Sequence, residues 1–239
     1  MFFNQIREMT STGFIQVYIA QGILFAYFII LGYKVLKRGI NRLNLFLSSF
    51  YFFVSLGLLI NFIYVLLSNE LTVLILYYTT LYLLFLGTMF LTSFITLLFK
   101  SDKIFTSKKQ VIIIICYNIA LFCMIFIPNG VIINQSTNWN PVYNIYFLIY
   151  LIIILSVFSF IPGIYYGLKL YHTIEEQFLK TRWKAFLIGI IGLYIFAYGT
   201  LISNTLNIQD FRTIWSLISV ILITIFSYLV YYGVAQRLD

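Results

Sequence analysis

The chain has 239 residues, of which 62% are hydrophobic and only 9% are charged, and its mean hydropathy is +0.98. A soluble domain carries roughly 25% charged residues, because it must present a polar surface to water. This composition excludes a soluble enzyme, a secreted disulfide scaffold, a disordered chain and a nucleic-acid-binding protein. It predicts a single all-α domain over residues 1–239, a helical bundle embedded in a membrane.

Charged residues divide the chain into apolar segments that are each long enough to cross a bilayer, which takes about 20 residues. The gap between Lys109 and Lys169 holds two such segments, separated by a polar, turn-rich stretch from Pro128 to Pro141. These segments are too long and too continuous for the strands of a β-barrel. The sequence therefore predicts seven transmembrane helices at about 14–36, 44–67, 71–98, 110–128, 142–168, 185–206 and 213–234.

The basic residues lie mostly in the first, third and fifth connections, which share one side of the membrane. They are Lys34, Lys37, Arg38 and Arg42, then Lys100, Lys103, Lys108 and Lys109, then Lys169, Lys180, Arg182 and Lys184, with Arg237 at the C-terminal end. Only Arg7 and Arg212 lie on the other side. Because basic connections stay in the cytoplasm, we expect the N-terminus outside and the C-terminus inside the cytoplasmic membrane. The net charge of +8 is then a topology signal that also suits binding of anionic lipid headgroups.

The predicted helices contain no Asp, Glu, Lys, Arg or His away from their ends, which argues against ion-coupled transport. Their interior amides have two possible roles: hydrogen bonds between helices, or the lining of a ligand cavity in the outer half. The candidates for such a cavity are Gln16, Gln21, Asn61 and Asn144, with Trp139 of the outer connection at its rim. The segment Trp139-Asn140-Pro141 has an alternative role as the cap of the fifth helix.

On the inner side, the connection from Tyr171 to Lys184 contains neither Gly nor Pro, so the fifth and sixth helices should extend beyond the bilayer there. Its basic and aromatic residues have two possible roles. They either form a docking surface for a cytoplasmic signalling protein, or anchor a helix end at the interface. The residues concerned are Lys180, Arg182, Trp183 and Lys184.

Smaller features concern packing. Pro162 should kink the fifth helix, and Gly163 and Gly167 have the spacing of a close helix contact. Tyrosine pairs near the predicted helix ends suit aromatic belts at the membrane interface; they are Tyr77-Tyr78, Tyr143-Tyr146, Tyr165-Tyr166 and Tyr231-Tyr232. Cys116 and Cys123 are two helical turns apart, about 10 Å, which is too far for a disulfide, so we expect them to pack as apolar residues.

The chain offers no catalytic motif, so we expect that it is not an enzyme. His172 is the only histidine and has no acidic or thiol neighbours, which predicts no metal site. Residues 213–236 contain no lysine that could carry retinal as a Schiff base, so no cofactor is expected either.

Three short segments lie where the predicted helices begin or end: Trp139-Asn140-Pro141, Arg182-Trp183 and Tyr231-Tyr232-Gly233. With these segments and its seven crossings, the chain resembles the seven-transmembrane sensor modules at the N-termini of some archaeal and bacterial histidine kinases. The resemblance implies a seven-helix bundle that responds to a ligand. The chain departs from the family because no signalling helix or kinase follows Asp239. We therefore expect the output to pass through a separate cytoplasmic partner.

We therefore expect a sensor or receptor-like membrane protein that responds to a small or lipidic ligand. Two alternatives stay open at this point. One is a transporter or lipid-translocating protein for a neutral or amphipathic substrate, and the other is a non-catalytic accessory subunit.

Overall fold

The computed structural model describes residues 15–104 and 106–235, with the backbone alone at 15–17, 101–104 and 235. Seven helical crossings follow one another along the chain, each long and apolar enough to span a membrane. Their elements are η2 (Ile15–Ala20) with α2 (Gln21–Leu36), α3 (Arg42–Tyr64), α4 (Glu70–Ile104), α5 (Ser107–Phe122) with η3 (Cys123–Phe126), α6 (Ile145–Leu155) with η5 (Ser156–Phe160) and α7 (Ile161–Thr173), α8 (Gln177–Leu206), and α9 (Gln209–Ala235). The prediction of an all-α fold with seven helices that could each cross a membrane is confirmed.

Several predicted boundaries differ from the structure by three or more residues, and two of the starts show the reasons. The sixth crossing begins at Gln177 rather than at 185, because the helix continues through the basic segment beside the membrane. The fifth begins at Ile145 rather than at 142, because Val142–Tyr143 form a short strand, β2, that pairs antiparallel with β1 (Val131–Ile132). Arg7, residue 14 at the predicted start of the first helix, and Arg237 lie outside the described residues.

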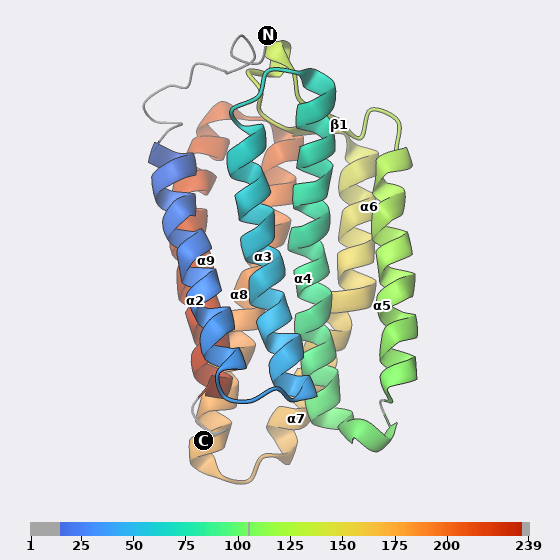
Figure 1. Cartoon of the computed structure of the whole chain (residues 1–239), viewed down its shortest axis with the longest axis vertical. Coiled ribbons are helices and arrows are strands. Elements are labelled where there is room, and N and C mark those ends of the chain that lie inside the picture. The colour runs from blue at the N-terminus through green and yellow to red at the C-terminus, as the bar shows by residue number, and fades with distance from the viewer. Residues whose placement is uncertain (1–14, 105, 236–239) are drawn as a thin grey trace.

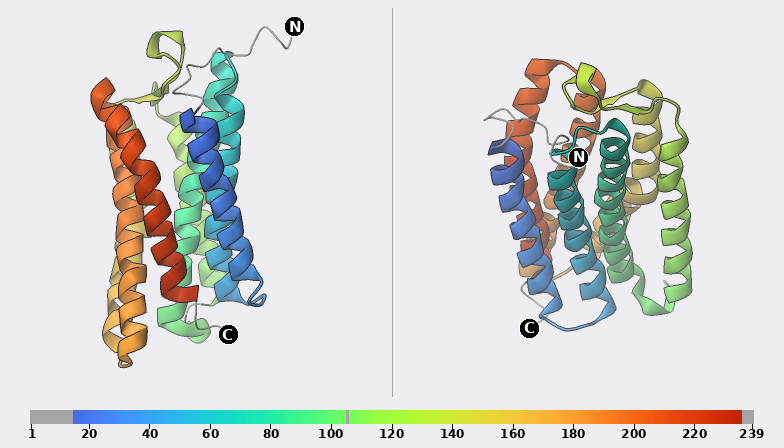
Figure 2. Two further views of the ribbon diagram at one scale, coloured as in Figure 1. Left: turned by 90° about the vertical axis from the view of Figure 1, so that its left-hand side faces the viewer. Right: turned by 45° about the horizontal axis from the view of Figure 1, so that its top comes forward.

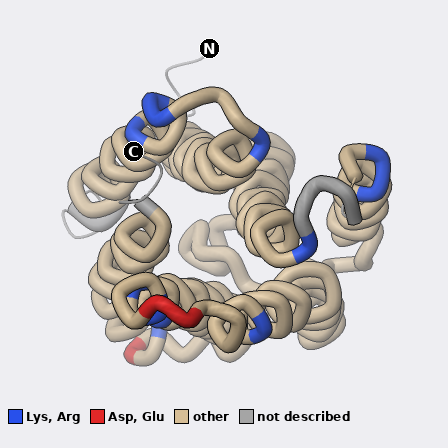
Figure 3. The backbone as a smooth tube through the Cα atoms, turned by 90° about the horizontal axis from the view of Figure 1, so that it is seen from below, with Lys and Arg blue, Asp and Glu red and all other residues tan. Residues whose placement is uncertain are grey.

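The two ends of the bundle differ in character (Figure 1). We call the end that carries β1 and β2 the hairpin end. We call the opposite end, where the connections hold most lysines and arginines, the basic end; it is seen in Figure 3. All but one of the described basic side chains lie at the basic end, and Arg212 is the exception.

Asparagines lie at the first or last position of several helices. Asn41 and Asn144 accept backbone N–H groups as the N-caps of α3 and α6, and Asn207 ends α8 in the left-handed conformation, at φ 51°. Asparagine suits both positions, since its short amide bonds to nearby backbone and tolerates positive φ. The connections are therefore fixed by local hydrogen bonds.

Helix α4 lies at the centre of the bundle and packs against α3 on one side and α7 on the other. Helices α8 and α9 form a second close pair, and α2 packs on α3, as the two views of Figure 2 show. Buried apolar side chains form two clusters: one near the hairpin end around Tyr77 and Phe147, and one toward the basic end around Phe94 and Phe186. Helix α4 contributes to both clusters and so connects the two ends.

The fifth crossing contains a π-helical turn in its middle, just before Pro162, the residue expected to kink it. Pro162 has no N–H to donate, and the preceding turn, η5, winds as a π-helix in which the Ile161 N–H bonds to the Ser156 carbonyl. Gly163 faces Thr92, and a Cβ added to Gly167 would lie 2.6 Å from a methyl group of Leu187. The prediction of a close helix contact is confirmed at Gly167, whereas a Cβ at Gly163 would meet Thr92 at an ordinary contact distance of 3.4 Å.

Two expectations about packing are wrong. Cys116 and Cys123 are both exposed, because α5 and η3 turn that face away from the bundle. The belt expectation is wrong for Tyr77, Tyr78 and Tyr143, which are buried, whereas Tyr146, Tyr165 and Tyr232 are exposed as a belt requires. The phenols of the three buried tyrosines instead contribute to polar contacts inside the hairpin end.

Candidate functional site

Two of the amides predicted to line a cavity bond to each other. The Asn61 amide donates to the Gln21 carbonyl oxygen and so joins α3 to α2. One turn earlier, the Tyr18 hydroxyl donates to the Phe62 backbone carbonyl at 3.1 Å. Gln16 lies in η2, and its side chain is outside those that the structure describes. At this place the amides stabilise a helix pair, at about 0.6 kcal/mol for each hydrogen bond.

Asn144 is engaged in shaping its own connection. Its Oδ1 accepts the Phe147 N–H at 2.7 Å, which caps α6. Its Nδ2 donates to the carbonyls of Pro128 and Asn129, both at 3.1 Å. Both the oxygen and the nitrogen of the Asn144 amide are thus hydrogen-bonded to the backbone. The cap of the fifth crossing is Asn144 rather than the Trp139-Asn140-Pro141 segment.

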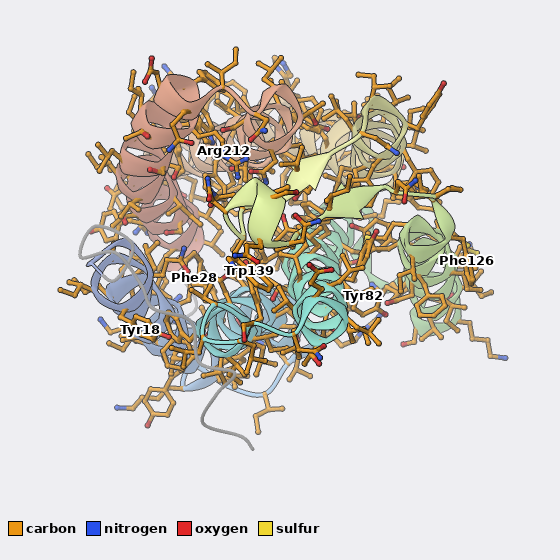
Figure 4. All side chains as sticks on the ribbon, turned by 90° about the horizontal axis from the view of Figure 1, so that it is seen from above. Tyr18, Phe28, Tyr82, Phe126, Trp139 and Arg212 are labelled. Carbon is orange, nitrogen blue, oxygen red and sulfur yellow. The ribbon has the colours of Figure 1, made fainter. Side chains whose placement is uncertain are left out.

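Trp139 follows a left-handed residue, Asn138, and itself has φ 59°. Its N–H donates to the Asn134 carbonyl at 2.8 Å, and its half-buried ring packs on the apolar cluster of the hairpin end. Figure 4 views this end and labels Trp139 together with Tyr18 and Arg212. The predicted ligand residues therefore fall into two groups, Gln21 with Asn61 between α2 and α3, and Asn144 with Trp139 in the connection before α6.

A different set of residues gathers at the hairpin end around Arg212. The Arg212 guanidinium donates through Nη1 to Asn207 at 2.7 Å and through Nη2 to Asn204 at 3.2 Å. Both acceptors are neutral amide oxygens. In the part of the chain that the structure describes, no carboxylate pairs with this half-buried guanidinium.

Two tyrosines extend this set toward α4. The hydroxyls of Tyr143 and Tyr77 hydrogen-bond to each other, and the ring of Tyr64 meets Tyr77 edge-on, with centroids 5.6 Å apart. Burial raises the pKa of Tyr143 to about 12, although hydrogen bonds with Tyr77 and Asn204 lower it in part. The Tyr143 phenol is therefore neutral near pH 7. We call Arg212, Asn204, Asn207, Tyr143 and Tyr77 the Arg212 cluster; its one charge is the guanidinium.

A second polar set lies deeper in the bundle. The Ser159 hydroxyl, in η5, shares hydrogen bonds with the hydroxyls of Thr92 at 2.8 Å and of Tyr194, and it donates to the Thr88 carbonyl at 2.9 Å. Ser159, Thr92 and Tyr194 are all buried. This set joins α4, η5 and α8 at the π-helical turn, a type of turn that is frequent at functional sites.

At the basic end, the four predicted docking residues separate into two kinds. Arg182 is only 3% exposed and donates to the Tyr232 carbonyl at 3.1 Å; Trp183 is 6% exposed and donates to the Gly167 carbonyl at 2.8 Å. Both side chains are packed between helices, so neither projects from the surface as a docking residue would. Lys180 is partly exposed, with Nζ 5.2 Å from the centre of the Tyr171 ring, and Lys184 is exposed.

A recess of about 170 Å³ opens beside these residues. Apart from the Arg182 guanidinium and the Trp183 indole, its lining is apolar; the lining residues are Leu43, Phe94, Leu98, Leu170, Leu179, Arg182, Trp183, Gly233 and Val234. Its volume is small beside the 300–1,000 Å³ of typical ligand pockets. The Arg212 cluster is therefore the stronger candidate for ligand recognition.

No family model, curated protein or solved structure matches this chain. Among the described residues, no three His, Cys, Asp or Glu side chains gather as a metal site would require. The Arg212 cluster was not predicted from the sequence, where Arg212 was interpreted as a topology signal and Tyr143 as part of an interfacial belt. The available signal was that Arg212 and Arg7 were the two exceptions to the distribution of bases.

Proposed function

We propose that this chain is a receptor-like protein of the cytoplasmic membrane, with its hairpin end outside. It binds a small or lipidic ligand with an anionic group at the Arg212 cluster, and it signals through a separate cytoplasmic protein at the basic end. The observation that carries this proposal is the half-buried Arg212 guanidinium, whose hydrogen-bond partners among the described residues are neutral amides.

The electrostatics of Arg212 favour an anion. Arg212 lies in the first turn of α9, where the unpaired backbone N–H groups carry partial positive charge that Asp210, in the same turn, offsets in part. A cation at this position is unfavourable by about 0.3–1 kcal/mol, and a bound carboxylate or phosphate would reverse that sign. The guanidinium has five N–H donors, and the hydrogen bonds to Asn204 and Asn207 leave others for a bidentate ligand.

Signal transfer would use α4. Tyr77 links the Arg212 cluster to this helix, and Thr92, more than three turns along it, meets the π-helical turn at Ser159. Helix α4 then continues to Ile104 at the basic end. A ligand that shifts Tyr143 against Tyr77 would bias the packing of α4 on η5 between two arrangements, as a two-state switch requires.

The test measures thermal stabilisation of the purified protein by carboxylate probes: acetate, octanoate, oleate and benzoate. Wild type should be stabilised by at least one probe, Arg212→Lys should respond less, and Arg212→Gln should not respond. A matched control, Lys184→Gln, removes one charge at the far end and should respond as wild type does. Loss of a charge-assisted hydrogen bond weakens binding by about 1.5–3 kcal/mol.

Two results would contradict the proposal. If no probe stabilises the wild type, or if Arg212→Gln responds as the wild type does, the Arg212 cluster is not the ligand site. If the stabilising probe is accumulated by proteoliposomes in an Arg212-dependent manner, the protein is a transporter rather than a receptor. A receptor binds the probe at the hairpin end without moving it across the bilayer.

A further inference from the structure

Two lysines at the basic end stand over aromatic rings where α4 and α7 meet. Lys100 Nζ lies 4.6 Å from the centre of the Tyr166 ring, and Lys169 Nζ lies 4.4 Å from that of Tyr165. Lys169 also lies 6.0 Å from the Phe99 ring. The contacts are within the range of cation–π interactions, so each ammonium is held in a defined place.

The rings beneath these lysines are themselves packed into one group. Phe99 and Tyr166 stack at 5.6 Å, and Tyr165 meets Tyr166 edge-on at 5.2 Å. We call Lys100, Lys169, Phe99, Tyr165 and Tyr166 the lysine–tyrosine clamp. Because the rings connect α4 to α7, both ammonium groups lie over one aromatic group where the two helices meet.

The clamp carries two positive charges that the described side chains do not neutralise: the contacts of both ammonium groups are with rings. Two adjacent cations repel each other unless an anion lies near both. The described acidic residues of the basic end, Glu175 and Glu176, belong to the connection between α7 and α8 beyond the end of α7. A phosphate placed between the lysines would supply the missing charge.

The position of the clamp suits a lipid phosphate. Lys100 ends the apolar segment of α4, and Lys169 is in the last turns of α7, so both stand at the level of headgroups if these helices cross a bilayer. On α7, Ile161, Tyr165 and Leu168 are exposed at helical spacing and form a stripe leading to Lys169. An acyl chain can lie along this stripe while its phosphate reaches the ammonium groups.

We propose that the lysine–tyrosine clamp binds the phosphate of an anionic glycerophospholipid in the leaflet at the basic end. The rings hold the lysines, the lysines bind the phosphodiester, and the stripe on α7 contacts an acyl chain. Exposed bases attract an anionic surface by charge alone, whereas this site requires two cations in fixed positions. Its lipid should therefore be retained when bulk lipid is removed.

The test uses the full chain in nanodiscs of mixed phosphatidylcholine and phosphatidylglycerol, followed by native mass spectrometry of the protein with its retained lipids. The double variant Lys100→Gln/Lys169→Gln is compared with a control of equal charge loss, Lys108→Gln/Lys184→Gln. Retention of phosphatidylglycerol should fall about fivefold for one clamp lysine and about thirtyfold for both, since each contributes about 1 kcal/mol. The control should retain it as wild type does.

A ring variant and a competition arm complete the test. Tyr166→Leu keeps both charges but frees Lys100, so it should lower retention by about the amount expected for one lysine. Equal loss in the clamp and control variants would show that total charge decides binding, and would overturn the proposal. Full displacement of the lipid by inorganic phosphate would assign the clamp to a free anion, and would overturn it also.

Discussion

The contact between α8 and α9 rests on glycines, and Gly189→Ala tests it directly. A Cβ added at Gly189 would lie 2.7 Å from the Phe226 carbonyl oxygen and 2.8 Å from the Val230 nitrogen. Both are backbone atoms of α9, which cannot rotate away as a side chain can, so the two helices must separate. Overpacking costs about 1–3 kcal/mol. A gain in helix propensity of about 1 kcal/mol offsets part of it, and a net loss of up to about 2 kcal/mol is expected.

The assay is reversible unfolding in mixed detergent and SDS micelles, followed by tryptophan fluorescence. The matched control is Gly22→Ala on α2, where an added Cβ meets nothing within 4 Å. The control should be as stable as wild type or slightly more stable. If Gly189→Ala unfolds at the same SDS fraction as Gly22→Ala, the close backbone contact of α8 with α9 is wrong.

Three further predictions follow from side-chain positions. Asn144→Ala should lower the free energy of unfolding by about 1–2 kcal/mol, because the N-cap of α6 is lost. The control Asn140→Ala should change it little. Equal losses in the two variants would contradict the role of Asn144 as the cap. Arg182→Gln should destabilise the protein by about 1.5–3 kcal/mol, because a buried hydrogen bond from a charged group is removed. Lys184→Gln, at an exposed position, should not destabilise it. A larger loss of stability in Lys184→Gln than in Arg182→Gln would contradict the burial of Arg182. With the native cysteines replaced, Ser136→Cys should react with an impermeant maleimide on intact cells and Lys184→Cys only after permeabilisation; the opposite pattern would invert the proposed orientation.

The sequence predicted the number and approximate limits of the helices, because charged residues and apolar length decide them. Lys100, for example, marks the end of the third apolar crossing in both the sequence and the structure. Gly167 also predicted a close helix contact, since a glycine acts on the backbone at its own position. These features depend on the residue and its near neighbours.

The candidate site was not predictable in the same way. Tyr143 and Tyr77 are 66 residues apart, and only the packing of β2 against α4 brings their hydroxyls together. In the sequence Arg182 resembles a surface base, because Lys180 and Lys184 beside it are surface bases. In the structure the helix directs Arg182 toward α9. Which face of an apolar membrane helix is buried cannot be derived from an amphipathic pattern, since lipid and protein interior are equally apolar.

The central claim is that an anion at the hairpin end changes the packing at the basic end. The most direct measurement is the distance between spin labels at Lys108→Cys and Lys184→Cys, on α5 and α8, with the native cysteines replaced. It is recorded with and without the carboxylate probe that stabilises the protein most. The account predicts a change in the distance distribution that Arg212→Gln abolishes. An unchanged distribution at saturating probe would contradict it.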